Sequence, residues 1–123
     1  HKYVSNYINS LDICLLPNQK IIYTYGAGVT NLNVNISTFT SPLKLFEYMS
    51  HKKAIIASDL TVLKEILNHE NSVLVECDDS SLWIKAIKNL KDKEKRDFIS
   101  ENALSDFSKY SWKNRAIQVV KNL

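Results

Sequence analysis

The chain has 123 residues, which suits one domain or part of one, and 45% of them are hydrophobic, enough to build a core. Charged residues make up 24%, and only two prolines and two glycines occur, which excludes a linker or a low-complexity segment. No apolar run approaches the ~20 residues that a membrane-spanning helix needs.

The net charge of +3 is concentrated in residues 80–123, which carry ten basic and five acidic residues. Such a segment can meet nucleic acid or an anionic membrane surface. In DKEKRDF the charges alternate in sign, which favours a solvated helix face, and no aromatic residues interleave with the lysines as a base-stacking platform requires. We therefore expect no nucleic-acid partner and leave peripheral association with a membrane open.

The two cysteines lie in or beside apolar runs, Cys14 in ICLLP and Cys77 after VLVE. Two cysteines make no metal framework, so both are interpreted as reduced packing residues. No apolar signal region opens the chain, and we expect a cytoplasmic protein, with peripheral attachment to the inner membrane face as the alternative.

The first elements are a helix, a strand and a long loop. Apolar residues at helical spacing predict a short helix over 3–10. The continuous apolar run at 12–17, ended by Pro17, is typical of a strand buried on both faces of a parallel sheet. Residues 18–40 are rich in Asn, Thr, Tyr and Gly and predict a long loop, with a local strand at 20–25.

The next elements alternate helix and strand. Ser41 is a good N-cap and Pro42 suits the first helical position, which predicts a helix from 42 to about 51 with Leu43, Phe46 and Met49 on its inner face. A buried strand follows at 54–58. A helix at 61–68 and a strand at 72–75 come next. The expected inner face of the 61–68 helix is Leu63, Ile66 and Leu67.

The remainder of the chain is predicted to be helical. A helix begins at Asp79 or Ser80 and ends near Leu90, and two further helices cover 93–109 and 112–122. The inner face expected for the first of these helices is Leu82, Trp83, Ala86, Ile87 and Leu90. The order of elements predicts an α/β fold: a three-layer, Rossmann-like parallel sheet with helices on both faces.

The beginning of the 42–51 helix is the first candidate binding site. Parallel sheets bind ligands beyond the carboxyl ends of their strands, and the 18–40 loop leads from such an end to this helix. The amides of the first helical turn attract anions, and Lys44 would place a positive charge beside a bound phosphate. The alternative is a solvated lysine at a helix N-terminus, which costs roughly 0.3–1 kcal/mol.

Glu47 is the second candidate, because it stands in an apolar run one turn beyond Leu43 and Lys44. A carboxylate near an apolar site needs hydrogen-bond donors or a positive partner, and a vicinal diol of a sugar offers two donors. The alternative is a surface glutamate that pairs with Lys44 or His51.

At these residues the sequence resembles a family. SPLKLFEYMSHKKAIIASDLTVLKEILNHENSVLVECDD resembles the carboxyl-terminal, donor-binding half of retaining glycosyltransferases of family 4, the group 1 glycosyl transferases, which have the two-domain GT-B fold. DICLLP resembles the strand that precedes the donor loop in this family. LKEIL followed by HENSVLV resembles the family's E-hydrophobe-hydrophobe, H-G-x-N-G-x-L-V segment. YSWKNRA resembles the start of the family's last helix. The resemblance spans roughly residues 7–120.

The resemblance implies a nucleotide-sugar donor, such as a UDP- or GDP-sugar, bound without a metal ion. Glu47 matches the second glutamate of the family's pair, which binds the ribose hydroxyls in relatives. The first glutamate, which contacts the transferred sugar, falls at Phe39. Lys53–Ala54 and Ser72 are milder departures. The nucleotide-sugar-binding residues implied are Thr40, Ser41, Pro42, Leu43, Lys44 and Glu47.

Residues 1–123 are then one partial domain, lacking the acceptor domain and the first donor-domain strands. The expected function is transfer of a hexose from the donor to a glycan or lipid-linked acceptor in surface polysaccharide biosynthesis, by the whole protein and not by this chain alone. A non-catalytic nucleotide- or protein-binding module is the alternative, and a sugar-nucleotide epimerase of related fold is a third.

The missing strands carry a further expectation. In the strand order 3-2-1-4-5-6 the three strands found correspond to the last three, so residues 12–17 form an open sheet edge. We expect self-association through this edge, or an added strand formed by residues 20–36.

Overall fold

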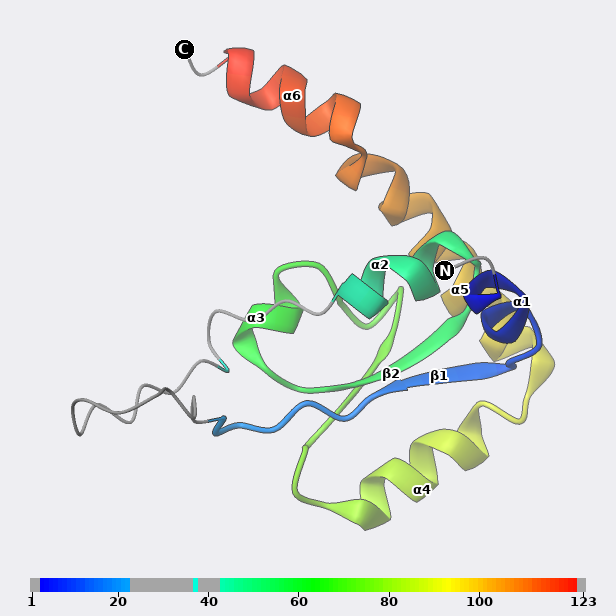
Figure 1. The fold of residues 1–123 in the computed structure, drawn as a ribbon. Helices are drawn as coiled ribbons and strands as arrows, with labels where there is room; N and C mark the ends of the chain where they lie inside the picture. The colour runs from blue at the N-terminus through cyan, green and yellow to red at the C-terminus, as the bar shows by residue number, and fades with distance from the viewer. Residues whose placement is uncertain (1–2, 23–36, 38–42, 122–123) are drawn as a thin grey trace.

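The structure is a computed structural model that describes residues 3–22, 37 and 43–121, apart from the side chain of Arg115 (Figure 1). The elements in chain order are α1 (Val4–Asn9), β1 (Ile13–Leu16), α2 (Leu43–Ser50), β2 (Ala54–Ser58), α3 (Thr61–Lys64), β3 (Val73–Val75), α4 (Ser80–Asn89), α5 (Lys93–Phe107), the 3-10 helix η1 (Ser108–Tyr110) and α6 (Trp112–Lys121). The predicted α/β fold with helices around a parallel sheet is confirmed.

The three strands lie side by side in chain order, β1-β2-β3, and both pairs are parallel. Leu15 pairs with Ile56 across the first pair, and Ile56 pairs with Val73 across the second. Each crossover runs through a helix, which places the carboxyl ends of all three strands along one edge of the sheet. The three strands therefore lie in the predicted order, which is that of the last half of a doubly wound sheet.

Two apolar clusters cover the two faces of the sheet. Ile55 and Ala57 of β2 pack against α2 and α3, whereas Ala54 and Ile56 pack against α4. Successive side chains of a strand point to opposite faces, so every residue of the central strand is buried. The buried residues outside the strands are Leu45, Met49, Val62, Leu63, Leu67 and Ala103 in the first cluster, and Ala86, Leu90 and Ile99 in the second.

β1 departs from the prediction of a strand buried on both faces. Cys14 and Leu16 are buried on the α2 side, but Leu15 is 40% exposed on the other face. Leu15 is exposed because α4 packs mainly on β3 and β2 and leaves this face of β1 uncovered. Within the described residues β1 pairs with β2 alone, as expected for an open edge. Residues 20–22 are not in a strand, and most of the 20–36 segment lies outside the described residues.

The inner face of α2 is not the one predicted. Leu45 and Met49, four residues apart, are fully buried, whereas Leu43 is 82% exposed. Phe46 is partly buried, with its ring centroid 5.5 Å from that of Tyr110. The apolar stripe is rotated from the predicted one, and Glu47 lies on the side of the helix away from Leu45.

α2 ends in a Schellman motif. The amide of Lys53 donates to the carbonyl of Tyr48, and that of Lys52 to the carbonyl of Met49, both at 3.1 Å. Lys52 has φ of 52°, a left-handed conformation that glycine usually provides. The Lys53 ammonium donates to the carbonyls of Asn9 and Leu11 at 2.9 Å and so holds the end of α1 beside the start of β2.

Two later helices also differ from expectation. α3 ends at Lys64 instead of Asn68, because Asn68 and Asn71 hold the following backbone in turns through their side chains. α4 begins at Ser80, within the predicted start, and the carboxylate of Asp79 caps it by accepting from the amides of Ser81 and Leu82. Of the predicted inner face of α4, Ala86 and Leu90 are buried and Trp83 is partly buried, but Leu82 and Ile87 are exposed.

Candidate functional site

The carboxyl edge of the sheet is crossed by the chain that leaves β1. The hydroxyl of Ser58, at the end of β2, donates to the carbonyl of Asn18 at 2.6 Å. Lys20 then reaches the end of β3, where its ammonium lies 2.5 Å from a Glu76 oxygen and 3.7 Å from an Asp78 oxygen. The hydroxyl of Ser37 donates to the Lys20 carbonyl at 2.6 Å. Both described parts of the predicted loop therefore lie at this edge.

Lys20 and Glu76 are exposed, and each stabilises the charged form of the other. The hydrogen bond to Glu76 raises the pKa of Lys20, and the same bond lowers the pKa of Glu76. Both groups stay charged across the physiological range. The pair fixes the beginning of the loop against the end of β3, two strands away from β1.

α2 runs antiparallel to the strands, so its first turn lies at this same carboxyl edge. Leu43 and Lys44 of that turn are exposed, and Glu47, one turn later, is half-buried. The three residues share the helix face opposite Leu45. The structure thus brings three of the six predicted site residues together, with a cationic group beside the helix N-terminus and a carboxylate behind it.

Glu47 has no side-chain partner within the described part of the chain. Its carbonyl accepts from the Ser50 hydroxyl at 2.8 Å and approaches His51 Nδ1 at 2.7 Å, but its carboxylate makes no ion pair or hydrogen bond there. Lys44 and His51, the two partners considered from the sequence, are not engaged with it. A half-buried carboxylate without a donor is a group that a ligand can satisfy.

The remaining predicted residues, Thr40, Ser41 and Pro42, lie outside the described residues, as does Phe39. The N-cap of α2 and the contacts of the transferred sugar therefore remain predictions.

Glu76, Cys77 and Asp78 form a group at the end of β3 whose ligand atoms lie within 4.8 Å of one another. Partial burial, then the Asp78 charge, raises the pKa of the Cys77 thiol, which opposes the thiolate that a metal ion needs. Glu76 is also held by Lys20. These three residues are the described group closest to a metal-binding geometry, but their present contacts favour the loop attachment.

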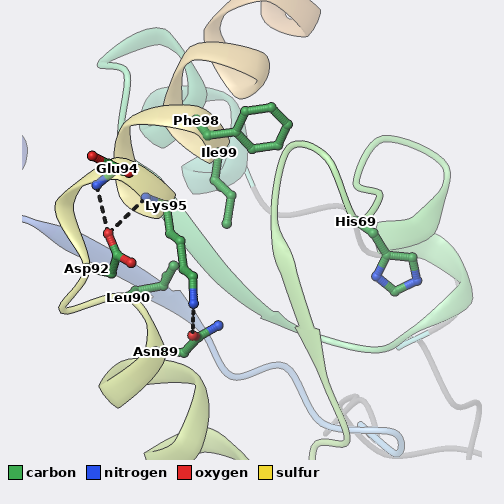
Figure 2. Close-up of a pocket in the computed structure, with 8 residues that line it drawn as sticks. All are labelled: His69, Asn89, Leu90, Asp92, Glu94, Lys95, Phe98 and Ile99. Atoms are coloured by element: carbon green, nitrogen blue, oxygen red, sulfur yellow. Dashed lines mark hydrogen bonds between the residues drawn. The ribbon is translucent and has the colours of Figure 1, made fainter.

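A hollow of about 360 Å³ lies near the opposite end of β3, between His69 and the junction of α4 and α5 (Figure 2). Its polar groups contact one another: Asp92 accepts from the amides of Glu94 and Lys95, and the Lys95 ammonium donates to Asn89 at 2.8 Å. Phe98 and Ile99 form its apolar wall. The polar groups cap α5 and join the two helices, so they are not arranged for a ligand.

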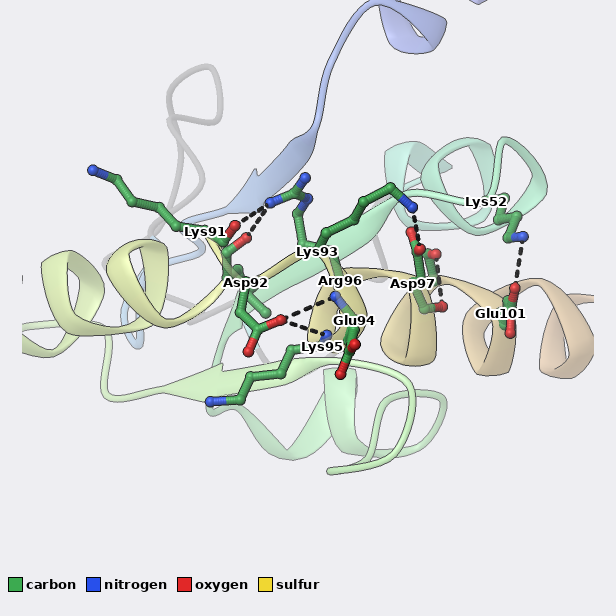
Figure 3. A network of polar contacts seen from close by, with 11 residues as sticks. Lys52, Lys91, Asp92, Lys93, Glu94, Lys95, Arg96, Asp97 and Glu101 are labelled. Atoms are coloured by element: carbon green, nitrogen blue, oxygen red, sulfur yellow. Dashed lines mark hydrogen bonds and ion pairs between the residues drawn. The ribbon is translucent and has the colours of Figure 1, made fainter.

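Several cations gather at the amino edge of the sheet (Figure 3). Arg96 Nη1 donates to the carbonyls of Leu90 and Lys91 at 2.8 Å, and so satisfies the end of α4. Lys93 pairs with Asp97, and Lys52 with Glu101. Each of these cations already has a partner, so the cluster holds helix ends together and leaves the carboxyl edge as the candidate site.

Sequence reasoning did not single out Lys20, Asn18 and Ser58. All three follow or end a strand, and polar residues at the carboxyl ends of parallel strands are the signal that points to them. Which of them bond to one another depends on the path of the chain across the edge, and no periodicity encodes that path.

Comparisons with protein families and with solved structures support this α/β fold. The family model described as Glycosyl transferases group 1 matches residues 2–93. Among solved structures, the sucrose-phosphate synthase from Thermosynechococcus elongatus has a similar fold, with a TM-score of 0.73 and 19% sequence identity. The match covers 98% of this chain and 27% of that one, so the chain spans about a quarter of that protein's length. No curated protein gives a significant match.

Proposed function

Because the chain belongs to the group 1 glycosyl transferases, we propose that it is the donor-binding part of a retaining, nucleotide-sugar-dependent glycosyltransferase. The donor is a UDP- or GDP-hexose. The acceptor is a glycan or lipid-linked sugar of surface polysaccharide biosynthesis, held by a further domain of the whole protein. The protein works in the cytoplasm.

The carboxylate of Glu47, which has no partner among the described residues, is the observation that carries this proposal. It lies one turn behind Lys44 on the outward face of α2, at the edge of the sheet where parallel folds bind ligands. A nucleoside diphosphate offers groups that complement both residues: ribose hydroxyls that donate to a carboxylate, and phosphates that accept from a cation and helix amides. The order along α2 then directs the diphosphate to the first turn and the ribose to the second.

The proposed chemistry asks little of the side chains. Transfer with retention places the acceptor on the face from which the diphosphate leaves, and the leaving oxygen takes the proton of the attacking hydroxyl. The protein contributes by positioning the donor and stabilising the negative charge that grows on the diphosphate. Lys44 and the amides of the first turn supply this stabilisation without a metal ion.

The test uses the complete product of the reading frame with a panel of UDP- and GDP-hexoses. Slow release of free nucleotide from one donor, accelerated by an acceptor and maintained in EDTA, supports a metal-independent transferase. NMR of the first product reports the anomeric configuration, which the proposal requires to match that of the donor.

Phe39, in place of the family's first glutamate, favours a second candidate function: a nucleotide-binding module without transferase activity. This candidate predicts that nucleoside diphosphates bind but that no donor is consumed. Binding with turnover supports the transferase. Binding without turnover for any donor and acceptor supports the module, and absence of both contradicts the two functions together.

A further inference from the structure

The chain that leaves β1 crosses the carboxyl edge of the sheet without regular structure. Residues 17–22 lie in neither a helix nor a strand, so no repeating backbone ladder fixes their path. Contacts with the neighbouring strands fix it instead. The carbonyl of Asn18 accepts from the Ser58 hydroxyl at the end of β2. The ammonium of Lys20 then reaches Glu76, at the end of β3, 2.5 Å away. This segment is therefore fastened to two strands in succession.

Lys20 is the point at which the two described parts of the loop meet. Its carbonyl accepts from the hydroxyl of Ser37 at 2.6 Å, although the two residues stand 17 positions apart. Ser37 is buried and stands shortly before Leu43, the first residue of α2. The side chain of Lys20 thus holds the outgoing part of the loop against β3, and its backbone holds the returning part that leads to α2.

Glu76 is a firm point of attachment for this lysine. The indole of Trp83, on α4, donates to the Glu76 carbonyl at 3.1 Å, so the end of β3 is joined to the helix that packs on it. Asp78 lies 3.7 Å from the Lys20 ammonium and adds a second negative charge. Lys20 therefore binds to a part of the sheet whose position is already fixed by α4.

We propose that Lys20 is a positioning residue of the donor site, because it sets the place from which the returning chain enters α2. The inference rests on the proposed function, since the groups that it positions are Lys44 and Glu47 of that helix. Lys20 acts through its bonds to Glu76 and Ser37 and does not contact the nucleotide. A loop that is fastened before the ligand arrives loses less conformational freedom on binding, which raises the affinity for the nucleotide.

The first experiment needs no ligand and uses trypsin, which cleaves after a lysine that can enter its specificity pocket. Mild digestion of the full-length product is followed by mass spectrometry of the fragments that end at Lys20. Glu76→Ala releases the ammonium and should speed this cleavage about twofold to fivefold, because proteolysis follows the population of the released loop. Glu101→Ala is the matched control, because it removes the partner of another exposed lysine, Lys52, and should leave cleavage after Lys20 unchanged.

The second experiment measures binding of UDP and of GDP by isothermal titration of charge-reversed variants. Lys20→Glu and Glu76→Lys should each weaken binding about fivefold, since like charges then push the loop away from β3. The two variants change the net charge in opposite directions, so general attraction of an anionic nucleotide cannot explain a loss in both. Their combination restores the ion pair with opposite polarity and should bind within about twofold of the parent. Lys52→Glu, Glu101→Lys and their combination are the controls and should bind like the parent.

Unchanged cleavage after Lys20 in Glu76→Ala would overturn the proposal, and so would a combined variant that binds no better than the two single variants. Equal losses of affinity in the Lys52 and Glu101 controls would also overturn it, because the effect would then be one of global stability, which thermal unfolding of each variant measures. If the parent binds neither UDP nor GDP, the proposed function fails and the positioning role fails with it. Faster cleavage in Glu76→Ala would still show, in that case, that Lys20 fastens the loop.

Discussion

The hydroxyl of Ser58 donates to the carbonyl of Asn18 at 2.6 Å and thereby ties the chain leaving β1 to the end of β2. Ser58 is fully buried, and its oxygen also lies 3.4 Å from the carbonyl of Leu16. The bond sets the direction in which the chain begins to cross the carboxyl edge. We therefore expect the geometry of the proposed nucleotide site to depend on Ser58.

Ser58→Ala should lower the free energy of unfolding by about 1–2 kcal/mol, because it leaves a backbone carbonyl without its donor. It should also weaken UDP binding by displacing the loop. Ser72→Ala is the matched control, since that buried hydroxyl likewise donates to a carbonyl, that of Asn68. Urea unfolding and UDP titration of both variants show whether Ser58 acts on the site or only on stability. Similar losses of UDP affinity in the two variants would mean that the effect is one of global stability.

Lys44→Ala should weaken binding of inorganic diphosphate by about 1–2 kcal/mol, the contribution of one charge-assisted hydrogen bond. The loss should shrink as salt rises, because the group is exposed. Lys85→Ala, an exposed lysine of α4, is the control and should bind diphosphate like the parent. An unchanged dissociation constant for Lys44→Ala at low salt would assign this lysine to the solvated surface.

Leu15→Lys should oppose association of the chain when it is studied alone. Among the residues that the structure describes, β1 pairs with β2 alone, and Leu15 is 40% exposed. A lysine on an open edge discourages pairing with a second chain. Sedimentation velocity over a range of concentrations should show the parent associating and the variant monomeric. Ile87→Lys, on exposed α4, should associate like the parent; a monomeric parent would contradict self-association through β1.

Asp106 makes stability depend on acid pH. Its hydrogen bond from Lys109, and then that from Asn71 at 2.8 Å, lowers the pKa of this carboxyl. A depressed folded-state pKa gives stability that is complete above the unfolded value, about 3.9, and is lost as pH falls through the folded value. Asp106→Asn should therefore cost about 0.5–1 kcal/mol at pH 7 and nothing below the folded pKa.

Urea unfolding of Asp106→Asn and of the parent, at pH 7 and at a pH below the folded pKa, measures the difference in their free energies of unfolding. Asp97→Asn is the comparison, because its pair with Lys93 is more exposed and should contribute less. A constant difference between Asp106→Asn and the parent at every pH would show that the charge of Asp106 is not responsible.

Much of the fold follows from local patterns. The strand 54–58 is a run of apolar and small residues and becomes the central strand, and Asp79 stands where a helix needs an N-cap. The strand order follows from alternation of strands and helices. The length of α3 does not, because Asn68 and Asn71 compete with the helix for the same backbone groups. The exposure of Leu15 depends on which strands α4 covers, a tertiary property.

The places of Lys44 and Glu47 in the fold were predicted, but the contacts of Glu47 were not. Lys44 and Glu47 lie on the expected helix and at the expected edge of the sheet. Spacing along a helix allows Glu47 to meet Lys44 or His51 but does not decide whether they pair, since rotamers and competing bonds decide it. In the structure His51 turns to the backbone carbonyl of Glu47 and leaves the carboxylate unengaged within the described residues.

The ribose role of Glu47 is the central claim, and isothermal titration of Glu47→Gln with three ligands tests it most directly. The ligands are UDP, 2′-deoxy-UDP and inorganic diphosphate, and the control is Glu65→Gln, at an exposed glutamate directly after α3. The account predicts that Glu47→Gln weakens UDP by about 1.5–3 kcal/mol, weakens 2′-deoxy-UDP much less, and leaves diphosphate unchanged. Equal losses for all three ligands would contradict a contact between Glu47 and the ribose.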